Sequence, residues 1–186
     1  MKPSFLFLAN GFEEIEALAT VDVLRRAQLD VTTVSIYNSK DVTGAHGIVV
    51  VADTTIGECD FTGADWLILP GGLPGADNLL ACKPLADLLQ KHFAAGGRVA
   101  AICASPGVVL APLGIVNGKK ATGYPGFEGK LEAGGATTTG ERVTVDGNVT
   151  TGNGPSSAVP FALAIVEQTA GKAIADGVAT GMLCNC

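Results

Sequence analysis

The amino-acid sequence predicts an α/β fold built around a mostly parallel β-sheet, and three observations support this prediction. Strand-like apolar runs alternate with helix-like segments along the chain, which is the pattern of βαβ units. Many of the 25 glycines stand in pairs or at the ends of apolar runs, where tight strand-to-helix turns need them. A chain of 186 residues buries about 70% of its unfolded surface. We therefore expect one domain spanning residues 1–186.

Hydrophobic periodicity predicts the elements of the first half of the chain. Ser4–Ala9 is an apolar run typical of a buried strand, and Phe12–Ala27 has the apolar spacing of a helix. This helix has acidic residues in its first turn and basic residues in its last, as its dipole favours. Its apolar positions are Ile15, Leu18, Ala19, Val23 and Ala27. Further strands are expected at 31–37, 48–52 and 65–69, with polar loops at 38–47 and 53–63.

The second half of the chain continues the alternation and then adds a β-hairpin. Polar and apolar residues alternate on both sides of Asp146–Gly147, which predicts a tight two-residue turn there. Gly171 and Lys172 end the last predicted helix. The expected elements are a helix at 84–95, a strand at 98–103, a helix starting at Ser105 and Pro106, a short strand at 119–122, hairpin strands at 142–145 and 148–151, and a helix at 158–170.

Composition excludes several classes of partner. The net charge of −6 argues against nucleic acid and anionic membranes, because both attract basic surfaces. No apolar stretch is long enough to span a membrane, and the N-terminal residues do not read as a signal peptide, so we expect a cytoplasmic protein. Five cysteines without regular spacing suit free thiols in a reducing compartment. Neither a dinucleotide-binding nor a P-loop glycine pattern is present, and we expect no cofactor.

Cys103 is the first candidate for a reactive residue. It ends an apolar strand and precedes the turn into a helix, and ligands bind at the carboxyl ends of strands in open parallel sheets. A helix N-terminus stabilises negative charge, so this position favours a thiolate. The alternative is a small buried hydrophobic residue, the more common state of a lone cysteine on an apolar run.

Two further strand ends should meet Cys103 at the same edge of the sheet. One carries Gly71–Gly72, whose N–H groups could form an oxyanion hole together with the amide of Ala104. The other leads into a helix bearing Glu16, which could share a proton with the thiol and act as an acid or a base. The alternatives are an ordinary strand-to-loop turn and a solvated helix residue.

The remaining polar candidates are less informative. Glu13 and Glu14 are explained as partners of the helix dipole. His46 lies in a polar loop and His92 near the end of a helix, so no Cys–His dyad is predicted. We expect no metal site, although the tail carries a Cys184-x-Cys186 pair, and Cys59 and Cys82 look structural.

Taken together, these motifs resemble the ThiJ/PfpI superfamily, in the branch that contains the parkinsonism-associated protein deglycase. The resemblance extends from one end of the chain to the other, and its glutamate motif and strand-end cysteine motif are specific. The matching stretches are Gly11–Glu16 (GFEEIE), Val21–Ala27 (VDVLRRA), Leu69–Gly72 (LPGG), Ala100–Pro106 (AAICASP) and Phe161–Glu167 (FALAIVE).

This resemblance implies a flavodoxin-like three-layer α/β/α sandwich that usually forms a homodimer. It carries the nucleophilic, oxidation-prone cysteine onto Cys103, the protonated glutamate onto Glu16, and the oxyanion amides onto Gly72 and Ala104, with Gly71 in support. The implied chemistry is cofactor-free attack on reactive dicarbonyls or their adducts. The alternatives are a non-catalytic redox sensor or stress chaperone that uses oxidation of Cys103, and an amidase or peptidase.

One position departs from the family pattern. Many members carry a histidine where this chain has Tyr124, and a phenol is a poor base near neutral pH. The peptidase alternative is weakened accordingly, and Glu16 would have to transfer the protons. The loop bearing His46 also lacks the arginine usual in that region.

Overall fold

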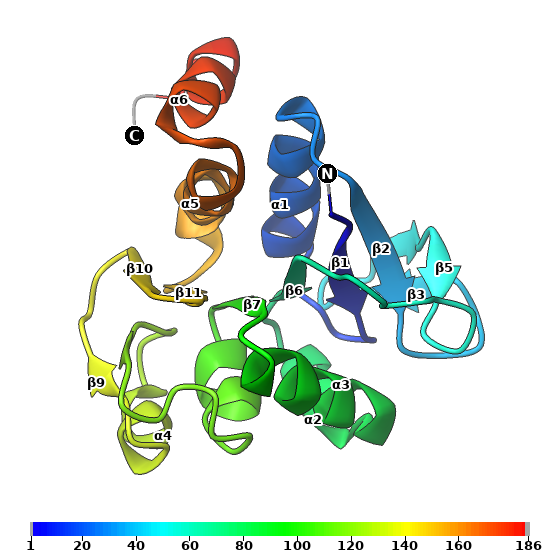
Figure 1. The fold of residues 1–186 in the computed structure, drawn as a ribbon. Helices are drawn as coiled ribbons and strands as arrows, with labels where there is room; N and C mark the ends of the chain where they lie inside the picture. The colour runs from blue at the N-terminus through cyan, green and yellow to red at the C-terminus, as the bar shows by residue number, and fades with distance from the viewer. Residues whose placement is uncertain (1, 185–186) are drawn as a thin grey trace.

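A computed structural model describes residues 2–184 as a three-layer α/β/α sandwich (Figure 1). The central sheet has seven strands in the order β10-β11-β7-β6-β1-β2-β5, and every neighbouring pair is parallel except β10 and β11. This arrangement confirms the predicted mostly parallel sheet with a β-hairpin. The strands are β1 (Ser4–Leu8), β2 (Val31–Ser35), β5 (Thr54–Thr55), β6 (Trp66–Leu69), β7 (Arg98–Ile102), β10 (Val143–Asp146) and β11 (Val149–Gly152).

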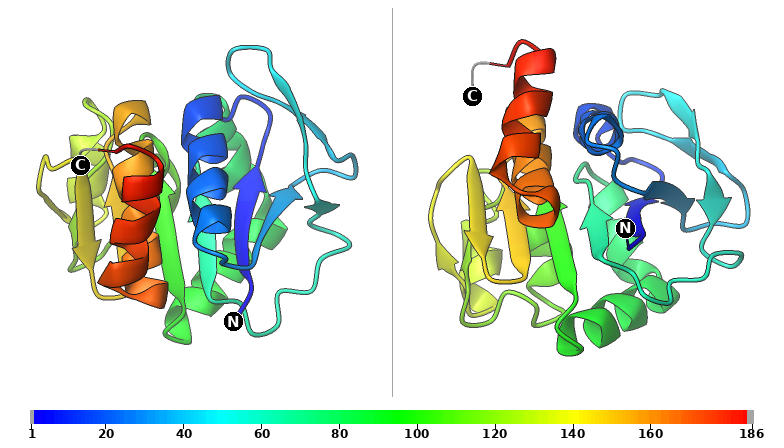
Figure 2. Two further views of the ribbon diagram at one scale, coloured as in Figure 1. Left: turned by 90° about the horizontal axis from the view of Figure 1, so that it is seen from above. Right: turned by 45° about the horizontal axis from the view of Figure 1, so that its top comes forward.

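Helices cover both faces of this sheet (Figures 1 and 2). Helices α1 (Glu14–Arg26) and α5 (Ala158–Ala170) pack against each other on one face, and α6 (Lys172–Gly181) packs against α5. On the other face lie α2 (Gly75–Ala81), α3 (Lys83–Ala94) and a π-helical turn at Pro106–Leu110. None of the helices within residues 2–184 is long and apolar enough to cross a membrane.

The central strands are apolar because helices bury both of their faces. All five residues of β1 and all four of β6 are buried, as expected of strands in the middle of a doubly covered sheet. Aromatic side chains fill much of the space between the layers, and Trp66, Phe7, Phe12 and Phe161 are the largest fully buried ones.

Helix α1 is shorter than predicted and buries only part of the predicted apolar face. It begins at Glu14 because Glu13 is its N-cap, with extended backbone and a carboxylate that accepts from the N–H of Glu16 at 2.7 Å. Ile15 and Leu18 were expected to be part of the apolar face, but they are 59% and 43% exposed. The buried positions of α1 include Glu16, which the apolar spacing alone would not have placed there.

Several short elements were not predicted. They are two to ten residues long, which leaves too little periodicity for the sequence to reveal them. Part of the loop at 38–47 pairs with the expected strand at 48–52 as a separate antiparallel hairpin, and the expected strand at 119–122 pairs outside the main sheet. The elements that were not predicted are β3 (Asp41–Thr43), β5, β9 (Thr137–Thr138), α2, α4 (Glu128–Ala133) and α6, whereas β4 (Val49–Val51) and β8 (Lys120–Ala121) lie within the expected strands.

The predicted turn of the main hairpin is wrong by one residue. Asp146 pairs with Val149, so the two-residue loop is Gly147–Asn148. Gly147 takes a φ of +60° at the first loop position, where a residue without a Cβ is least strained. The final helix at 158–170 is confirmed, but a further helix, α6, follows Gly171.

The expectation of free thiols holds for three of the four cysteines that lie within residues 2–184. Cys59, Cys82 and Cys103 are free, whereas Cys184 is disulfide-bonded. The C-x-C spacing alone does not distinguish free thiols from paired ones, and Cys186 lies outside the described residues.

Candidate active site at the ends of three parallel strands

Cys103 occupies a sharp backbone turn immediately after β7. Its φ of +64° is unusual for a residue with a side chain, and such a conformation costs on the order of 1–2 kcal/mol. Two backbone hydrogen bonds hold it there: its N–H donates to the carbonyl of Gly152 at 2.9 Å, and its carbonyl accepts from the N–H of Tyr124 at 2.8 Å. The side chain is 7% exposed, so the position is nearly enclosed. The expected helix does follow, but as a π-helical turn.

The turn after β6 approaches Cys103 so closely that it needs glycine. A Cβ on Gly71 would lie 2.5 Å from the Cβ of Cys103 and 2.8 Å from Oε2 of Glu16. Gly72 has a φ of +87°, and a Cβ there would lie 2.5 Å from the carbonyl oxygen of Gly11. The three strand ends that the sequence predicted to converge therefore do meet.

Glu16 reaches this junction from the first turn of α1. Its side chain is completely buried, and Oε2 accepts a hydrogen bond from the N–H of Gly71 at 2.8 Å. The carboxyl also interacts with the Cys103 side chain, but Oε1 has no hydrogen-bond partner of good geometry. A solvated Glu16, the alternative to a role in the site, is therefore wrong. Burial raises the pKa of Glu16 to about 7, against the lowering effect of hydrogen bonds from Gly71 and Cys103.

The pKa of the Cys103 thiol is higher than the sequence suggested. Burial, together with the charge of Glu16 and a hydrogen bond to Glu16, raises its pKa to about 12. The N–H groups of Gly72 and Ala104 act in the opposite direction, because they donate to the sulfur and stabilise its charged form. Desolvation and the neighbouring carboxyl therefore oppose the thiolate that the helix N-terminus is predicted to favour, and the thiolate stays a prediction.

Cys103 and Glu16 together hold one proton between pH 7 and pH 12, because their pKa values lie near these limits. The two groups titrate as a coupled pair, so the sulfur and the carboxyl share this proton. Moving it to Glu16 creates a thiolate that already faces two N–H groups. This arrangement can generate a nucleophile by one short proton transfer to a carboxyl whose pKa is close to neutral.

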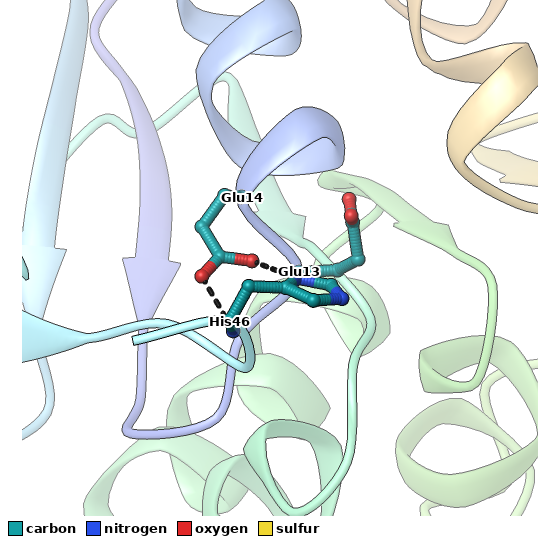
Figure 3. A group of neighbouring side chains, drawn as sticks. All are labelled: Glu13, Glu14 and His46. Carbon is teal, nitrogen blue, oxygen red and sulfur yellow. Dashed lines mark hydrogen bonds and ion pairs between the residues drawn. The ribbon is translucent and has the colours of Figure 1, made fainter. Parts of the chain in front are cut away.

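Glu13, Glu14 and His46 form a second polar group, shown in Figure 3. The backbone N–H and Nδ1 of His46 each lie 2.7 Å from a carboxylate oxygen of Glu14. Burial opposes the charge of Glu14, but these bonds prevail and lower its pKa, while they raise the pKa of the largely exposed His46. The three residues offer ligand atoms within 4.8 Å of one another. Both oxygens of Glu14 are already engaged by His46, and Glu13 caps the helix, so the group is largely satisfied by its own contacts.

Comparison with known proteins identifies the family of this chain. The DJ-1/PfpI family model matches residues 4–168. The chain belongs to the DJ-1/PfpI family. It is 42% identical to the Arabidopsis thaliana protein DJ-1 homolog A over 95% of this chain and 45% of that protein, so it spans less than half of that relative. Drosophila melanogaster protein dj-1beta is 36% identical over 98% of this chain and 97% of that protein.

Other DJ-1/PfpI proteins extend the comparison to structure and activity. The structure titled Toxoplasma gondii DJ-1, oxidized, superimposes with a TM-score of 0.95 at 35% identity and full coverage of both chains. A Caenorhabditis elegans protein named Glutathione-independent glyoxalase DJR-1.2 is 36% identical over 86% of this chain and 83% of that protein. The structural match confirms the flavodoxin-like α/β fold of the family.

Neither histidine of this DJ-1/PfpI protein forms a hydrogen bond with Cys103. His46 bonds to Glu14, and Nε2 of His92 lies 3.1 Å from the carbonyl oxygen of Arg98. Tyr124 is 45% exposed, and its contact with Cys103 is made by its backbone N–H. Glu16 is therefore the titratable side chain that interacts with the sulfur.

Sequence reasoning missed one polar residue of this junction. Ser105 is completely buried, and its hydroxyl donates to the carbonyl of Pro70 at 2.5 Å. The sequence showed only a serine at the start of a helix, where an N-cap is the usual interpretation. Ser105 makes no side-chain cap, and no local pattern indicates a partner 35 residues away.

Proposed function

We propose that this protein is a cofactor-independent, cysteine-dependent enzyme that acts on reactive dicarbonyls or their adducts, in the manner of a glyoxalase or deglycase. The observation that carries the proposal is the buried Glu16 carboxyl, with a pKa of about 7, in contact with the Cys103 thiol. A general acid–base works best when its pKa lies near the operating pH. The name of the Caenorhabditis elegans relative supports the same class of reaction.

The proposed reaction begins when Cys103 adds to the aldehyde of a 2-oxoaldehyde. The sulfur–carbon bond forms as Glu16 takes the thiol proton. Glu16 then passes this proton to the carbonyl oxygen, which gives a hemithioacetal. Donors at Gly72 and Ala104, which face the sulfur, are suited to the charge that develops beside it.

Glu16 then moves a proton from the former aldehyde carbon to the neighbouring carbonyl carbon, while the proton of the hemithioacetal hydroxyl passes to the neighbouring carbonyl oxygen. The first carbon becomes the thioester carbonyl and the second carries the hydroxyl, so a thioester of a 2-hydroxy acid results. Water breaks the thioester and restores the thiol. The overall change adds one water to the dicarbonyl, so methylglyoxal would yield lactate without an external oxidant or reductant.

This proposal is tested with purified protein and methylglyoxal by measuring lactate. Cys103→Ser and Glu16→Gln should each lose about 10²-fold or more of turnover, the usual contribution of a nucleophile or an acid–base group. Cys59→Ser is the matched control, because Cys59 is a free cysteine away from this junction and should turn over normally. Unchanged turnover in either site variant would reject the mechanism.

A redox role for Cys103 is the second candidate. The Toxoplasma gondii relative has a structure described as oxidized, and the sulfur of Cys103 is the one that lies beside Glu16. Mild peroxide followed by mass spectrometry distinguishes the two candidates. Selective oxidation of Cys103 in a protein with no dicarbonyl turnover favours the sensor, whereas oxidation elsewhere with Cys103 intact counts against it.

We also propose that the protein forms a homodimer through α1 and the β3–β4 hairpin. Both carry exposed apolar side chains, and the His46–Glu14 contact joins them. Such a patch marks an interaction surface on an otherwise polar protein. Its members are Ile15, Leu18, Ile48, Val49 and Val51. Light scattering should give twice the chain mass, and Leu18→Glu should give a monomer.

A further inference from the structure

Ser105 lies in a position to couple the two turns that supply the donors of the site. The paired register of β6 and β7 ends at Leu69 opposite Ala101. Beyond that point the two segments continue as turns that stay close, because a Cβ on Gly71 would lie 2.5 Å from that of Cys103. The Ser105 hydroxyl donates from one of these turns to the Pro70 carbonyl of the other at 2.5 Å.

The two joined residues adjoin the groups that contact the Cys103–Glu16 pair. Pro70 directly precedes Gly71, whose N–H donates to Glu16 at 2.8 Å. Gly72 follows Gly71, and its N–H donates to the Cys103 sulfur. Ser105 directly follows Ala104, the other donor to the sulfur. The sulfur and the amide of Ala104 thus belong to one turn, while the amides of Gly71 and Gly72 belong to the other.

We propose that Ser105 is a positioning residue that holds the Gly71–Gly72 turn against Cys103 and Glu16. The bridge is rigid because Ser105 is completely buried and Pro70 is buried too. Without the hydroxyl, the Gly71–Gly72 turn loses its link to the Cys103 turn and is held only by its bonds to α1 and α2, such as that of Gly71 to Glu16. The loss should affect the amide of Gly72 more than that of Ala104, because Ala104 shares a turn with Cys103.

The inference is tested by the pH profile of Cys103 alkylation with iodoacetamide, followed by mass spectrometry. Ser105→Ala should move the profile to higher pH, with an alkylation rate about threefold lower at a fixed alkaline pH, which corresponds to half a pKa unit. Ser105→Thr retains the hydroxyl and should follow the wild type. Thr150→Ala is the matched control, because Thr150 is also completely buried and its hydroxyl accepts from Gln168 at 2.8 Å.

Superimposable profiles for Ser105→Ala and wild type would overturn the inference, as would equal shifts in Ser105→Ala and Thr150→Ala. If Ser105→Ala does not fold, Ser105→Thr carries the test, because a shifted profile in a folded variant that keeps the hydroxyl also contradicts the inference.

The inference rests on the proposed role of Cys103, but alkylation needs no dicarbonyl turnover. Failure of the glyoxalase proposal and failure of this one are therefore separate results. In an active enzyme, Ser105→Ala should lower kcat and leave KM within about twofold of wild type.

Discussion

Replacing Glu16 by glutamine should stabilise the protein above neutral pH and change its stability little in acid. Burial raises the pKa of this carboxyl from 4.5 to about 7 in the folded protein, so the folded state binds the proton more tightly than the unfolded chain does. That contribution to stability is complete below pH 4.5 and is lost as the pH rises through about 7. A shift of about 2.5 units corresponds to about 3 kcal/mol of unfolding free energy. Glutamine does not ionise, and its amide oxygen can still accept from Gly71.

The measurement is the free energy of urea unfolding of both proteins at pH 5 and at pH 8. The difference between Glu16→Gln and wild type should grow by up to about 3 kcal/mol over this range, or roughly 10 °C in Tm for a domain of this size. Glu14→Gln is the matched control from the same helical turn. Its pKa is lowered chiefly by bonds from His46, whose own pKa Glu14 raises from 6.5, so the pair stabilises the protein most when His46 is charged and this variant should lose more stability at pH 5 than at pH 8. A Glu16→Gln effect of equal size at both pH values would refute the explanation of the raised pKa by burial.

Three further predictions concern the same site. Glu16→Gln should move Cys103 alkylation to lower pH, because the carboxylate charge that raises the thiol pKa is gone; a profile unchanged from wild type would contradict this. Turnover of methylglyoxal, as kcat/KM, should rise with pH through about 7, since the base form of Glu16 must take the thiol proton, and a profile that is flat from pH 5 to 8 would exclude that step. Gly71→Ala should slow turnover by at least about tenfold and destabilise the protein by on the order of 1–3 kcal/mol, because a Cβ 2.5 Å from that of Cys103 forces the turn away. Gly57→Ala is the control for both assays, because there is open space around Gly57.

Residues that belong to regular segments were predicted well from the sequence. The central strands and helix α5 were predicted from local hydrophobic runs, and the parallel sheet was predicted from the alternation of strands with helices. Cys103 and the glycine turn were found because a strand end before a helix is a local feature. Ile15 and Leu18 show the limit of this reasoning: helical spacing marks them as apolar, but which face of α1 is buried depends on the sheet and α5 that pack against it.

The state of the site was decided by contacts between distant parts of the chain. Gly71 is 55 residues from Glu16, and Pro70 is 35 residues from Ser105. The sequence by itself determined which chemical groups stand at the strand ends, since strand and helix formation depend on neighbouring residues. Only the tertiary structure decided that the carboxyl is fully buried beside the thiol, that burial raises the pKa of both groups and that a serine hydroxyl joins the two turns, because desolvation and hydrogen bonding depend on what the fold brings together.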